Sequence, residues 1–495
     1  MGDGDLCDLT ANRALDLFRR RQLSPVELTH AVLDRAQASQ GAINAFAYLA
    51  PDQAIETAKA AETRYLGRGE APRALEGLCV ALKDSGSVTG WPTSYGSLTA
   101  DLTPRRTTSP ENDTMLRAGA TLIGSTRTPE FSGALFTQSR VGGVTRNPHN
   151  LDLTPGGSSG GAAASVAVGA ATLAMGSDIG GSIRVPAACC GVVGYKPPKG
   201  RNPVTPPFNL DQFCHTGPLA RSVTDTLLMQ NAISGPHPGD VTTLHPKLTL
   251  TAAVKPLTGL RVAYSLNLGF FEIDPDIAKN TRTALSVFET CGATLTEITL
   301  PWDGSVIDAA KTHLSHIFSS WMAEMSEGQT DLLCPYTRTW LSMGRSGTAQ
   351  DFYAALCCAG QMGQSFAAAM ADHDIFICPT TALPAVPADF DHARDPLVIN
   401  DRPVDPILGW ALAVPFNMLS SHPVLAVPSG TAGNACPTGI QIVAKPFQDQ
   451  HVFDAALTYE AELGGFHSIL KTPDWRTDPE AGPSAMTGTQ TNNSR

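Results

Sequence analysis

Basic residues are scarce in this sequence relative to acidic ones. Lys and Arg together number 35 against 46 Asp and Glu, so the formal net charge is −11. Because nucleic acids are bound through clustered positive charge, this balance argues against a nucleic-acid partner. Long apolar runs are also lacking. The nearest, residues 160–176, is rich in Ala and Gly and suits tight packing better than a membrane span, so we expect no membrane association.

Paired cysteine motifs are absent too. None of the 11 cysteines forms a C-x-x-C pair, and their odd number does not suggest a disulfide framework. We therefore expect reduced, mostly buried thiols. The start of the chain, "MGDGDLCDLT", has neither the basic nor the apolar region of a signal peptide. Together these features predict a cytoplasmic protein.

Helix and strand patterns alternate along the chain. Ser24, Pro25 and Glu27 form the sequence of a capping box at the start of a helix. Further helices are expected over residues 52–65, 276–290 and 349–370. Short apolar runs read as buried strands: "GLCVALK", "TLIG", "RVAYS" and "DIFICPT". The alternation predicts an α/β layer architecture with helices on both faces of a sheet.

The chain shows no repeat with a period of 20–50 residues. We expect a single domain over residues 1–475. It consists of an N-terminal helical region (1–70), a core that carries lysine and serine motifs (71–230) and a remainder (231–475) that completes the sheet. Residues 476–495 contain almost no core-forming side chains, so they predict a disordered tail.

Residues 154–187 contain five serines and no histidine. The sequence "GGSSG" at 156–160 fits the nucleophile elbow of α/β-hydrolases. However, "NPHNLDLTP" before it reads as a loop instead of the required strand, and no histidine downstream has a recognisable context. In "SDIGGSIR", glycines before Ser182 leave backbone N–H groups unobstructed, as an oxyanion hole requires. A tight turn with no catalytic role would explain the same glycines.

The two serine clusters gain significance from three further motifs. These are "VALKD", which places Lys83 after an apolar run, "GPLARSV" at 217–223 and "CPTTALPA" at 378–385. In this order, over roughly residues 8–470, the sequence resembles the amidase signature family. The resemblance implies an α/β fold with one large mixed β-sheet covered by helices on both faces. It also implies hydrolysis of amides, with some bacterial members cleaving carbamates or aryl esters.

The resemblance also implies a role for each motif residue. Ser182 corresponds to the nucleophile, Lys83 to the base, and Ser158 to a bridging serine that follows a cis peptide bond. The backbone N–H groups of Ile179, Gly180, Gly181 and Ser182 correspond to the oxyanion hole. Ser177 is expected to support Lys83 through a hydrogen bond, and Gly157 to relieve crowding beside Ser158.

These residue types suit the chemistry. Lysine has an ordinary pKa of about 10.4 and can act as a base only if burial favours its neutral form. Alternation along a strand would hold Lys83 inside and turn Asp84 to the opposite face. We expect Asp178 and Arg184 to hold the active-site loop. The pair His313 and His316 has no third ligand at suitable spacing, so neither a metal nor another cofactor is expected.

Substrate-pocket candidates come from three segments. They are "EFSGALF" with Phe131 and Phe136, the region after the nucleophile with Arg201, and "ILGWALAVPFNML" with Trp410. Core packing would explain each alone; together they predict an apolar pocket for a small aryl or alkyl amide or carbamate, as in aryl acylamidases and urethanases. We expect a monomer or homodimer.

The alternative function is that of the amide-transfer component of a glutamine-dependent, tRNA-linked amidotransferase, which acts within a multi-subunit complex. The sequence at 336–361 does not look like the Gly/Tyr-rich helix of that component. A binding protein without catalytic activity is a further alternative, and the presence of Lys83, Ser158 and Ser182 argues against it.

Overall fold

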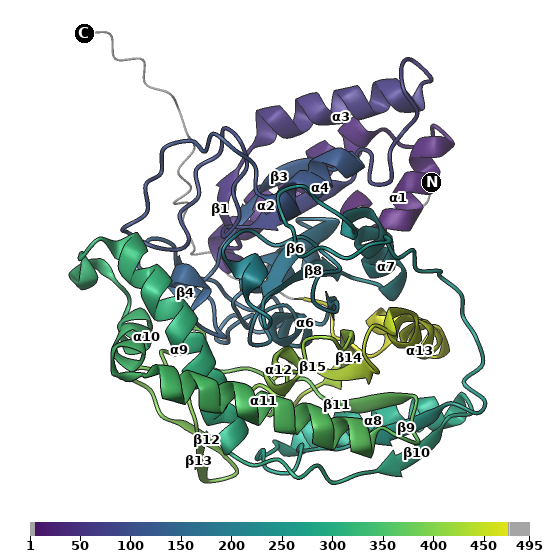
Figure 1. Cartoon of the computed structure of the whole chain (residues 1–495). Helices are drawn as coiled ribbons and strands as arrows, with labels where there is room; N and C mark the ends of the chain where they lie inside the picture. Colours follow the sequence, from purple (N-terminus) through teal and green to yellow (C-terminus); the bar gives the residue numbers. More distant parts are fainter. Residues whose placement is uncertain (1–4, 474, 476–495) are drawn as a thin grey trace.

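The computed structural model describes residues 5–473 and 475. Within them, one 11-stranded sheet has the order β1-β3-β2-β6-β8-β7-β14-β15-β11-β9-β10 (Figure 1). Its strands are β1 (Phe46–Leu49), β2 (Cys79–Lys83), β3 (Thr121–Thr126), β6 (Leu173–Asp178), β7 (Val193–Lys196), β8 (His215–Ala220), β9 (Arg261–Tyr264), β10 (Thr294–Glu297), β11 (Ile375–Pro379), β14 (Val424–Thr431) and β15 (Pro437–Ala444). Two small hairpins pair β4 (Gln138–Ser139) with β5 (Gly143–Val144) and β12 (Leu397–Ile399) with β13 (Arg402–Val404).

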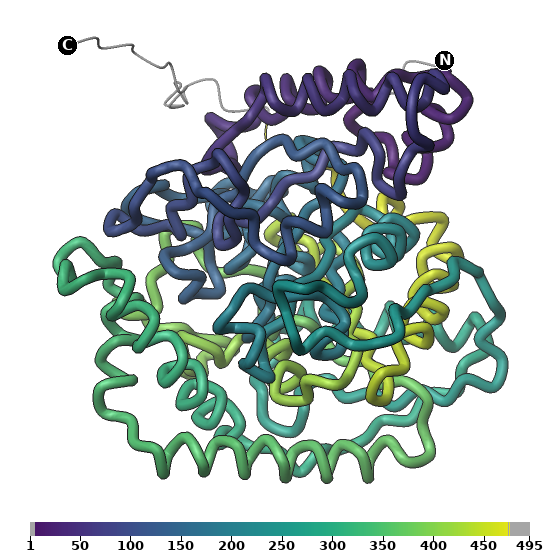
Figure 2. The backbone as a smooth tube through the Cα atoms, turned by 45° about the horizontal axis from the view of Figure 1, so that its top comes forward, coloured from purple at the N-terminus to yellow at the C-terminus, as the bar shows by residue number. Residues whose placement is uncertain are grey.

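The helices are α1 (Ala11–Arg19), α2 (Pro25–Ile43), α3 (Pro51–Tyr65), α4 (Pro110–Ala118), α5 (Gly160–Ala167), α6 (Arg184–Cys190), α7 (Val223–Ile233), α8 (Pro275–Thr290), α9 (Ser305–Ser326), α10 (Pro335–Ser346), α11 (Ala349–Ala369), α12 (Pro415–Met418) and α13 (Asp449–Glu462). Figure 2 shows the N-terminal helices at one end of the molecule and α9–α11 at the other.

The sheet is mixed. Strands β3, β2 and β6 run parallel, as do β11, β9 and β10, whereas the central strands from β6 to β11 pair antiparallel. The predicted mixed α/β sheet is therefore confirmed. All four strand predictions were correct, and the 160–176 run forms α5 and most of β6. The N-terminal region predicted to be helical contains α1, α2 and α3, and also the unpredicted strand β1, which joins the edge of the sheet.

Helices cover both faces of the sheet, as the alternation of side chains along β15 shows. Ile440 and Ile442 pack in a cluster with Phe453 of α13, whereas Val443 packs in a separate cluster with Val185 of α6. Because successive side chains of a strand point to opposite faces, α6 and α13 lie on opposite sides of the sheet. Two of the three apolar clusters of the described core thus lie on opposite faces of the sheet at β15.

Several local predictions are confirmed. At the start of α2, the Ser24 N–H donates to Glu27 Oε2 at 2.8 Å, and the Ser24 hydroxyl accepts from the Val26 N–H at 3.0 Å. Helix α11 ends at Ala369, one residue before the predicted end. All eleven cysteines are free thiols, and eight are buried. The predicted tail at 476–495 lies outside the described residues.

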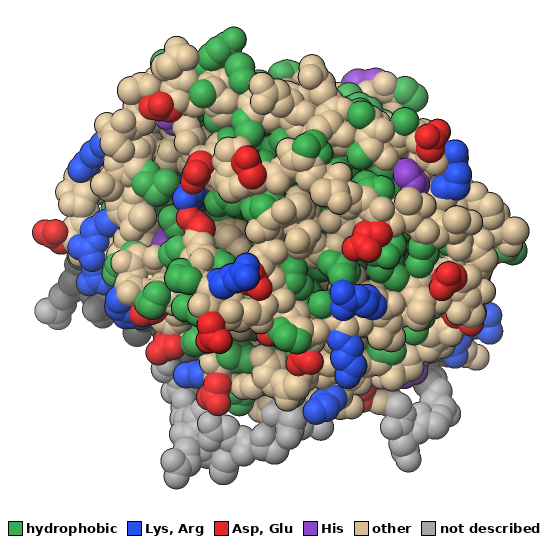
Figure 3. All heavy atoms as spheres, turned by 90° about the horizontal axis from the view of Figure 1, so that it is seen from below, with side chains coloured by type: hydrophobic (Ala, Val, Ile, Leu, Met, Phe, Trp, Pro, Cys, Tyr) green, Lys and Arg blue, Asp and Glu red, His purple; other side chains and the backbone are tan. Residues whose placement is uncertain are grey.

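The surface carries charges of both signs. On the face shown in Figure 3, Lys and Arg side chains are interspersed with Asp and Glu, and neither sign forms a continuous patch. Across the described chain, none of the helices combines the length and apolar character needed to cross a membrane.

Candidate active site

Strand β2, which lies between β3 and β6 in the sheet, ends in a buried lysine. Lys83 is the last residue of β2 and is only 3% exposed. Its Nζ donates to the hydroxyl of Ser158 at 2.6 Å and to the hydroxyl of Ser177 at 2.8 Å. The parallel pairing of β2 with β6 puts Ser177 beside the lysine, since both strands end at the same edge of the sheet. The expected hydrogen bond between Lys83 and Ser177 is therefore present, with the lysine as donor.

Burial lowers the pKa of Lys83 to about 7, and the more distant Cys214 and Asp178 oppose this shift only in part. At neutral pH a large fraction of the amine is therefore uncharged and able to accept a proton. The next residue, Asp84, is also buried, but its carboxylate accepts hydrogen bonds from the Ser94 N–H and hydroxyl. Burial raises the pKa of Asp84 to about 6. The carboxylate is thus engaged away from the amine, as strand alternation predicts.

Ser158 lies in the loop that leads into α5. The Gly157–Ser158 peptide bond is cis, as the family resemblance implied. A Cβ on Gly157 would lie 2.4 Å from the carbonyl oxygen and 2.7 Å from the nitrogen of Phe136. Only glycine allows the loop to approach the 131–136 segment this closely. Glycine at position 157 therefore allows the close contact with Phe136, in addition to its expected role of relieving crowding beside Ser158.

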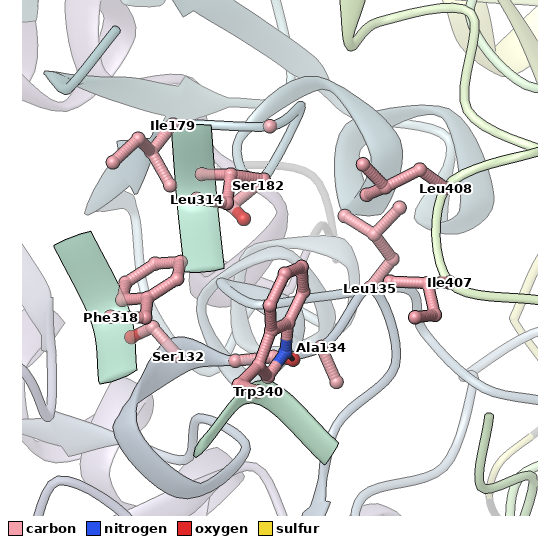
Figure 4. A pocket seen from close by; sticks show the side chains of 12 residues that line it. Ser132, Ala134, Leu135, Ile179, Ser182, Leu314, Phe318, Trp340, Ile407 and Leu408 are labelled. Carbon is pink, nitrogen blue, oxygen red and sulfur yellow. Dashed lines mark hydrogen bonds between the residues drawn. The ribbon is translucent and has the colours of Figure 1, made fainter. Parts of the chain in front are cut away.

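Ser182 lies in the turn between β6 and α6, and its carbonyl accepts a hydrogen bond from the Ser159 N–H at 3.1 Å. Its hydroxyl faces the pocket in Figure 4. Within residues 5–473 and 475, this hydroxyl makes no hydrogen bond, so the contact between Ser158 and Ser182 that a proton relay needs is not closed. Catalytic hydrogen bonds commonly tighten only when substrate binds.

The four backbone N–H groups predicted to form an oxyanion hole are not all free. In the described chain, the backbone N–H groups of Ile179, Gly180 and Ser182 have no hydrogen-bond acceptor. The Gly181 N–H, however, donates to Asp178 Oδ1 at 2.8 Å. Including Gly181 among the free donors was therefore wrong for this structure, because the Asp178 carboxylate occupies its N–H. The remaining three are available to an oxygen ligand.

Asp178 and Arg184 form a fully buried ion pair beneath this turn. Arg184 Nη2 lies 2.9 Å from Asp178 Oδ1, and its Nη1 donates to Gln441 Oε1 at 2.6 Å. Asn417 Nδ2 also donates to Asp178 Oδ1, at 2.8 Å. Burial by itself would raise the pKa of Asp178, but the Arg184 guanidinium lowers it below its ordinary value. The pair thus stays ionised and holds the turn, as predicted, and neither side chain lines the pocket.

A narrow, open pocket lies in front of Ser182 (Figure 4). No charged side chain is among the residues that line it. The lining residues are Ser132, Gly133, Ala134, Leu135, Ile179, Gly180, Ser182, Leu314, Phe318, Trp340, Ile407 and Leu408. The Trp340 indole N–H is already bonded to the Gly133 carbonyl oxygen at 2.6 Å. The Ser132 hydroxyl is hydrogen-bonded to that of Thr128, so the free polar groups of the lining are the Ser182 hydroxyl and backbone groups, and the walls are apolar.

The four predicted pocket side chains do not line this pocket. Phe131 and Phe136 are buried in the core, and Trp410 is fully buried nearby. Arg201 pairs with Asp449 at 3.0 Å. Two of the predicted segments do contribute, but through residues 132–135 and 407–408. The largest side chains of these segments turn into the protein, where burial of apolar area stabilises them most.

Sequence reasoning missed the contribution of α9 and α10. Leu314 and Phe318, four residues apart on one face of α9, and Trp340 on α10 form the far wall of the pocket. Helical spacing could have grouped Leu314 with Phe318. Nothing in the sequence indicated that this face would meet the glycine/serine turn.

The H-x-x-H pair does not form a joint site. His313 Nε2 lies 2.9 Å from Asp211 Oδ1, whereas His316 contacts the carbonyl oxygens of Thr312 and Thr348. In the part of the chain that the structure describes, no three His, Cys, Asp or Glu side chains are grouped so as to hold a metal ion.

The chain is similar to an acylamidase and to an amidotransferase subunit along nearly its whole length. It is 31% identical to an acylamidase from Rhodococcus erythropolis, over 93% of this chain and 97% of that protein. It is 30% identical to a glutamyl-tRNA(Gln) amidotransferase subunit from Geobacter metallireducens, over 92% and 97% respectively. Among solved structures, a bacterial aryl acylamidase of the amidase signature family superposes with a TM-score of 0.87 at 27% identity, covering 95% of this chain and 99% of that one.

A 6-aminohexanoate cyclic dimer hydrolase superposes with a TM-score of 0.83 at 26% identity, covering 96% of this chain and 100% of that one. The model of the Amidase family matches residues 27–453, which include the lysine strand, both serine clusters and the pocket segments. The chain therefore belongs to the amidase signature family, whose members act on C–N bonds.

Proposed function

We propose that the protein is a serine amidohydrolase that cleaves small apolar or aromatic amides or carbamates through an acyl-enzyme on Ser182. The main support is the buried Lys83 amine, 2.6 Å from the Ser158 hydroxyl and 2.8 Å from that of Ser177, with a pKa lowered to about 7. A serine hydroxyl becomes a nucleophile when a base can take its proton. Lys83 is a base suited to neutral pH.

In the proposed reaction, Ser182 Oγ forms a bond to the substrate carbonyl carbon. Its proton passes to Ser158 Oγ, and the Ser158 proton passes to Lys83 Nζ. The carbonyl oxygen gains the negative charge and accepts hydrogen bonds from the free N–H groups of Ile179, Gly180 and Ser182.

Collapse of this intermediate breaks the bond to the leaving group, an amine for an amide. Lys83 returns a proton to it through Ser158, leaving an ester on Ser182. Water hydrolyses the ester by the same proton route and restores the free hydroxyl.

The pocket supports the substrate class. An aryl or alkyl group can bury apolar surface against Leu314, Phe318 and Trp340, at about 25 cal/mol per Å². Free glutamine carries an ammonium and a carboxylate, and no charged side chain in the pocket lining can pair with either. Unpaired charge is costly to bury, so the lining favours neutral substrates. The amide and the carbamate remain equal candidates.

The second candidate function is that of the amide-transfer component of a tRNA-linked amidotransferase. It is favoured by the 30% identity to the Geobacter metallireducens protein along nearly its whole length. The same Lys–Ser–Ser arrangement would then release ammonia from glutamine for a partner protein. The uncharged pocket weighs against this alternative.

A substrate panel tests the proposal. We expect kcat/KM for an anilide or an aryl carbamate to exceed that for glutamine by at least about a hundredfold, or roughly 2.7 kcal/mol. Ser182→Ala, assayed on every substrate, is the matched control and corrects for contaminating activity. Efficient glutamine hydrolysis by the isolated chain would overturn the proposal and favour the amidotransferase function.

A further inference from the structure

Glu130 is a buried carboxylate behind the pocket wall that the proposed reaction does not use. It begins the short helix η2 (Glu130–Ser132) and is 0% exposed. Its Oε1 accepts from the Ser97 hydroxyl at 2.8 Å. Its Oε2 accepts from the Cys334 N–H and the Thr337 hydroxyl, each at 2.6 Å. Cys334 is the N-cap of α10, so the negative charge lies at the positive end of that helix.

The two segments that Glu130 joins both line the pocket. Ser132 and Gly133 follow it by two and three residues, and Trp340 lies on α10. The Trp340 indole N–H donates to the Gly133 carbonyl oxygen at 2.6 Å. The Glu130 N–H donates to the Tyr336 hydroxyl at 2.7 Å, which adds another link to α10. The wall is therefore held together by polar bonds whose charged member is Glu130.

The turn after Glu130 has an unusual backbone. Phe131 and Ser132 have φ of 51° and 58°, in the left-handed region that residues other than glycine rarely adopt. Such conformations persist where the surroundings enforce them. On the other side, a Cβ on Gly96 would lie 2.7 Å from the Thr128 carbonyl oxygen, so the loop that carries Ser97 packs directly on this turn. Glu130 bonds both of the segments that enclose it.

We propose that Glu130 is a positioning residue for substrate binding. By clamping the 132–133 turn to the start of α10, it sets the separation between that turn and Trp340, and so the width of the pocket for an aryl or alkyl group. This inference rests on the proposed function, because it takes the pocket as the substrate site. Glu130 acts on substrate only through Ser132, Gly133 and Trp340.

Kinetics on matched variants test the proposal. Glu130→Ala leaves buried donors unsatisfied, so we expect KM for an aryl amide to rise about tenfold while kcat changes less than about threefold. Glu130→Gln should largely restore KM, because its oxygen can accept from Cys334 and its amide nitrogen can donate to Ser97. Glu111→Gln is the control. Glu111 is also buried, at 7% exposed, and its two carboxylate oxygens share the Thr205 hydroxyl, but it does not line the pocket.

A fall in kcat at unchanged KM, or an equal rise of KM in Glu111→Gln, would overturn the proposal. If Glu130→Ala does not fold, Thr337→Val removes one donor to the same carboxylate, and we expect it to raise KM about threefold. An unchanged KM in that folded variant would also contradict the proposal.

A spectroscopic readout separates this inference from the proposed function. In protein labelled with 5-fluorotryptophan, the Trp340 resonance can be identified by its loss in Trp340→Phe. We expect Glu130→Ala to shift it, Glu130→Gln to restore it and Glu111→Gln to leave it unchanged. This holds even if the wild type hydrolyses no amide or carbamate, an outcome that would reject only the proposed function. An unmoved Trp340 resonance in Glu130→Ala would reject the positioning role.

Discussion

Two strands of the sheet end in a buried lysine, and the two lysines have different surroundings. Strand β2 ends in Lys83 and β7 ends in Lys196, and neither side chain is more than 3% exposed. Burial is the leading cause that lowers the pKa of each amine. Lys83 donates to the hydroxyls of Ser158 and Ser177, whereas Lys196 donates to the carbonyl oxygen of His422 at 2.9 Å.

The comparison shows that burial, which both lysines share, does not by itself make an amine useful as a base in a reaction. The hydrogen-bond partner of the amine also matters. A hydroxyl both donates and accepts, so Ser158 can give a proton to a neutral Lys83 and take another from Ser182. A carbonyl oxygen has no proton to give. Lys196 is therefore a structural amine held by a carbonyl oxygen, whereas the hydroxyl beside Lys83 offers the route to Ser182 that the proposed function requires.

The largest expected effect is on turnover. Lys83→Met should lower kcat by about 10²–10⁴, the usual contribution of a positioned base. Lys196→Met should leave kcat within about threefold, because its amine has no route to Ser182. Steady-state rates, with circular dichroism to confirm folding, measure both. Equal losses in the two folded variants would remove the distinction between the lysines.

The pH profile sharpens the comparison. Only the neutral form of Lys83 accepts a proton, so activity should be full above its pKa of about 7 and fall with acid below it, about tenfold in kcat/KM per pH unit. Lys196→Met should retain the wild-type midpoint. A profile flat from pH 5 to 8 would contradict the role of Lys83.

The smallest effect concerns the second hydroxyl beside Lys83. Ser177→Ala removes an acceptor at 2.8 Å that favours the charged ammonium over the neutral amine. We expect the acid limb of the pH profile to move to lower pH and kcat to fall about threefold, since one hydrogen bond is lost. A limb that moves to higher pH would show that Ser177 stabilises the neutral amine instead.

The sequence could predict that Lys83, Ser158 and Ser177 lie together because each of them belongs to a local motif. Lys83 is held by the end of one apolar strand, and Ser177 and Ser182 by a single strand and turn, so a short motif encodes each position. The glycines around Ser158 and Ser182 could be interpreted in the same way. Even here, the engagement of the Gly181 N–H by Asp178 required the structure, because it depends on where a buried ion pair settles.

The pocket could not be predicted to the same degree because it is assembled from distant segments. Phe131 and Ser132 are neighbours, yet only Ser132 faces the pocket, since the turn adopts left-handed backbone angles. Phe318 and Trp340 reach the site through the packing of α9 against α10, more than 130 residues after Ser182. Periodicity identifies the apolar face of a helix but not what that face meets.

Labelling with a fluorophosphonate, followed by mass spectrometry of the adduct, tests the central claim most directly. The account predicts one adduct on Ser182 in the wild type, much slower labelling in Lys83→Met and wild-type labelling in Lys196→Met. An adduct on Ser158 in place of Ser182, or labelling of Lys83→Met at the wild-type rate, would contradict it.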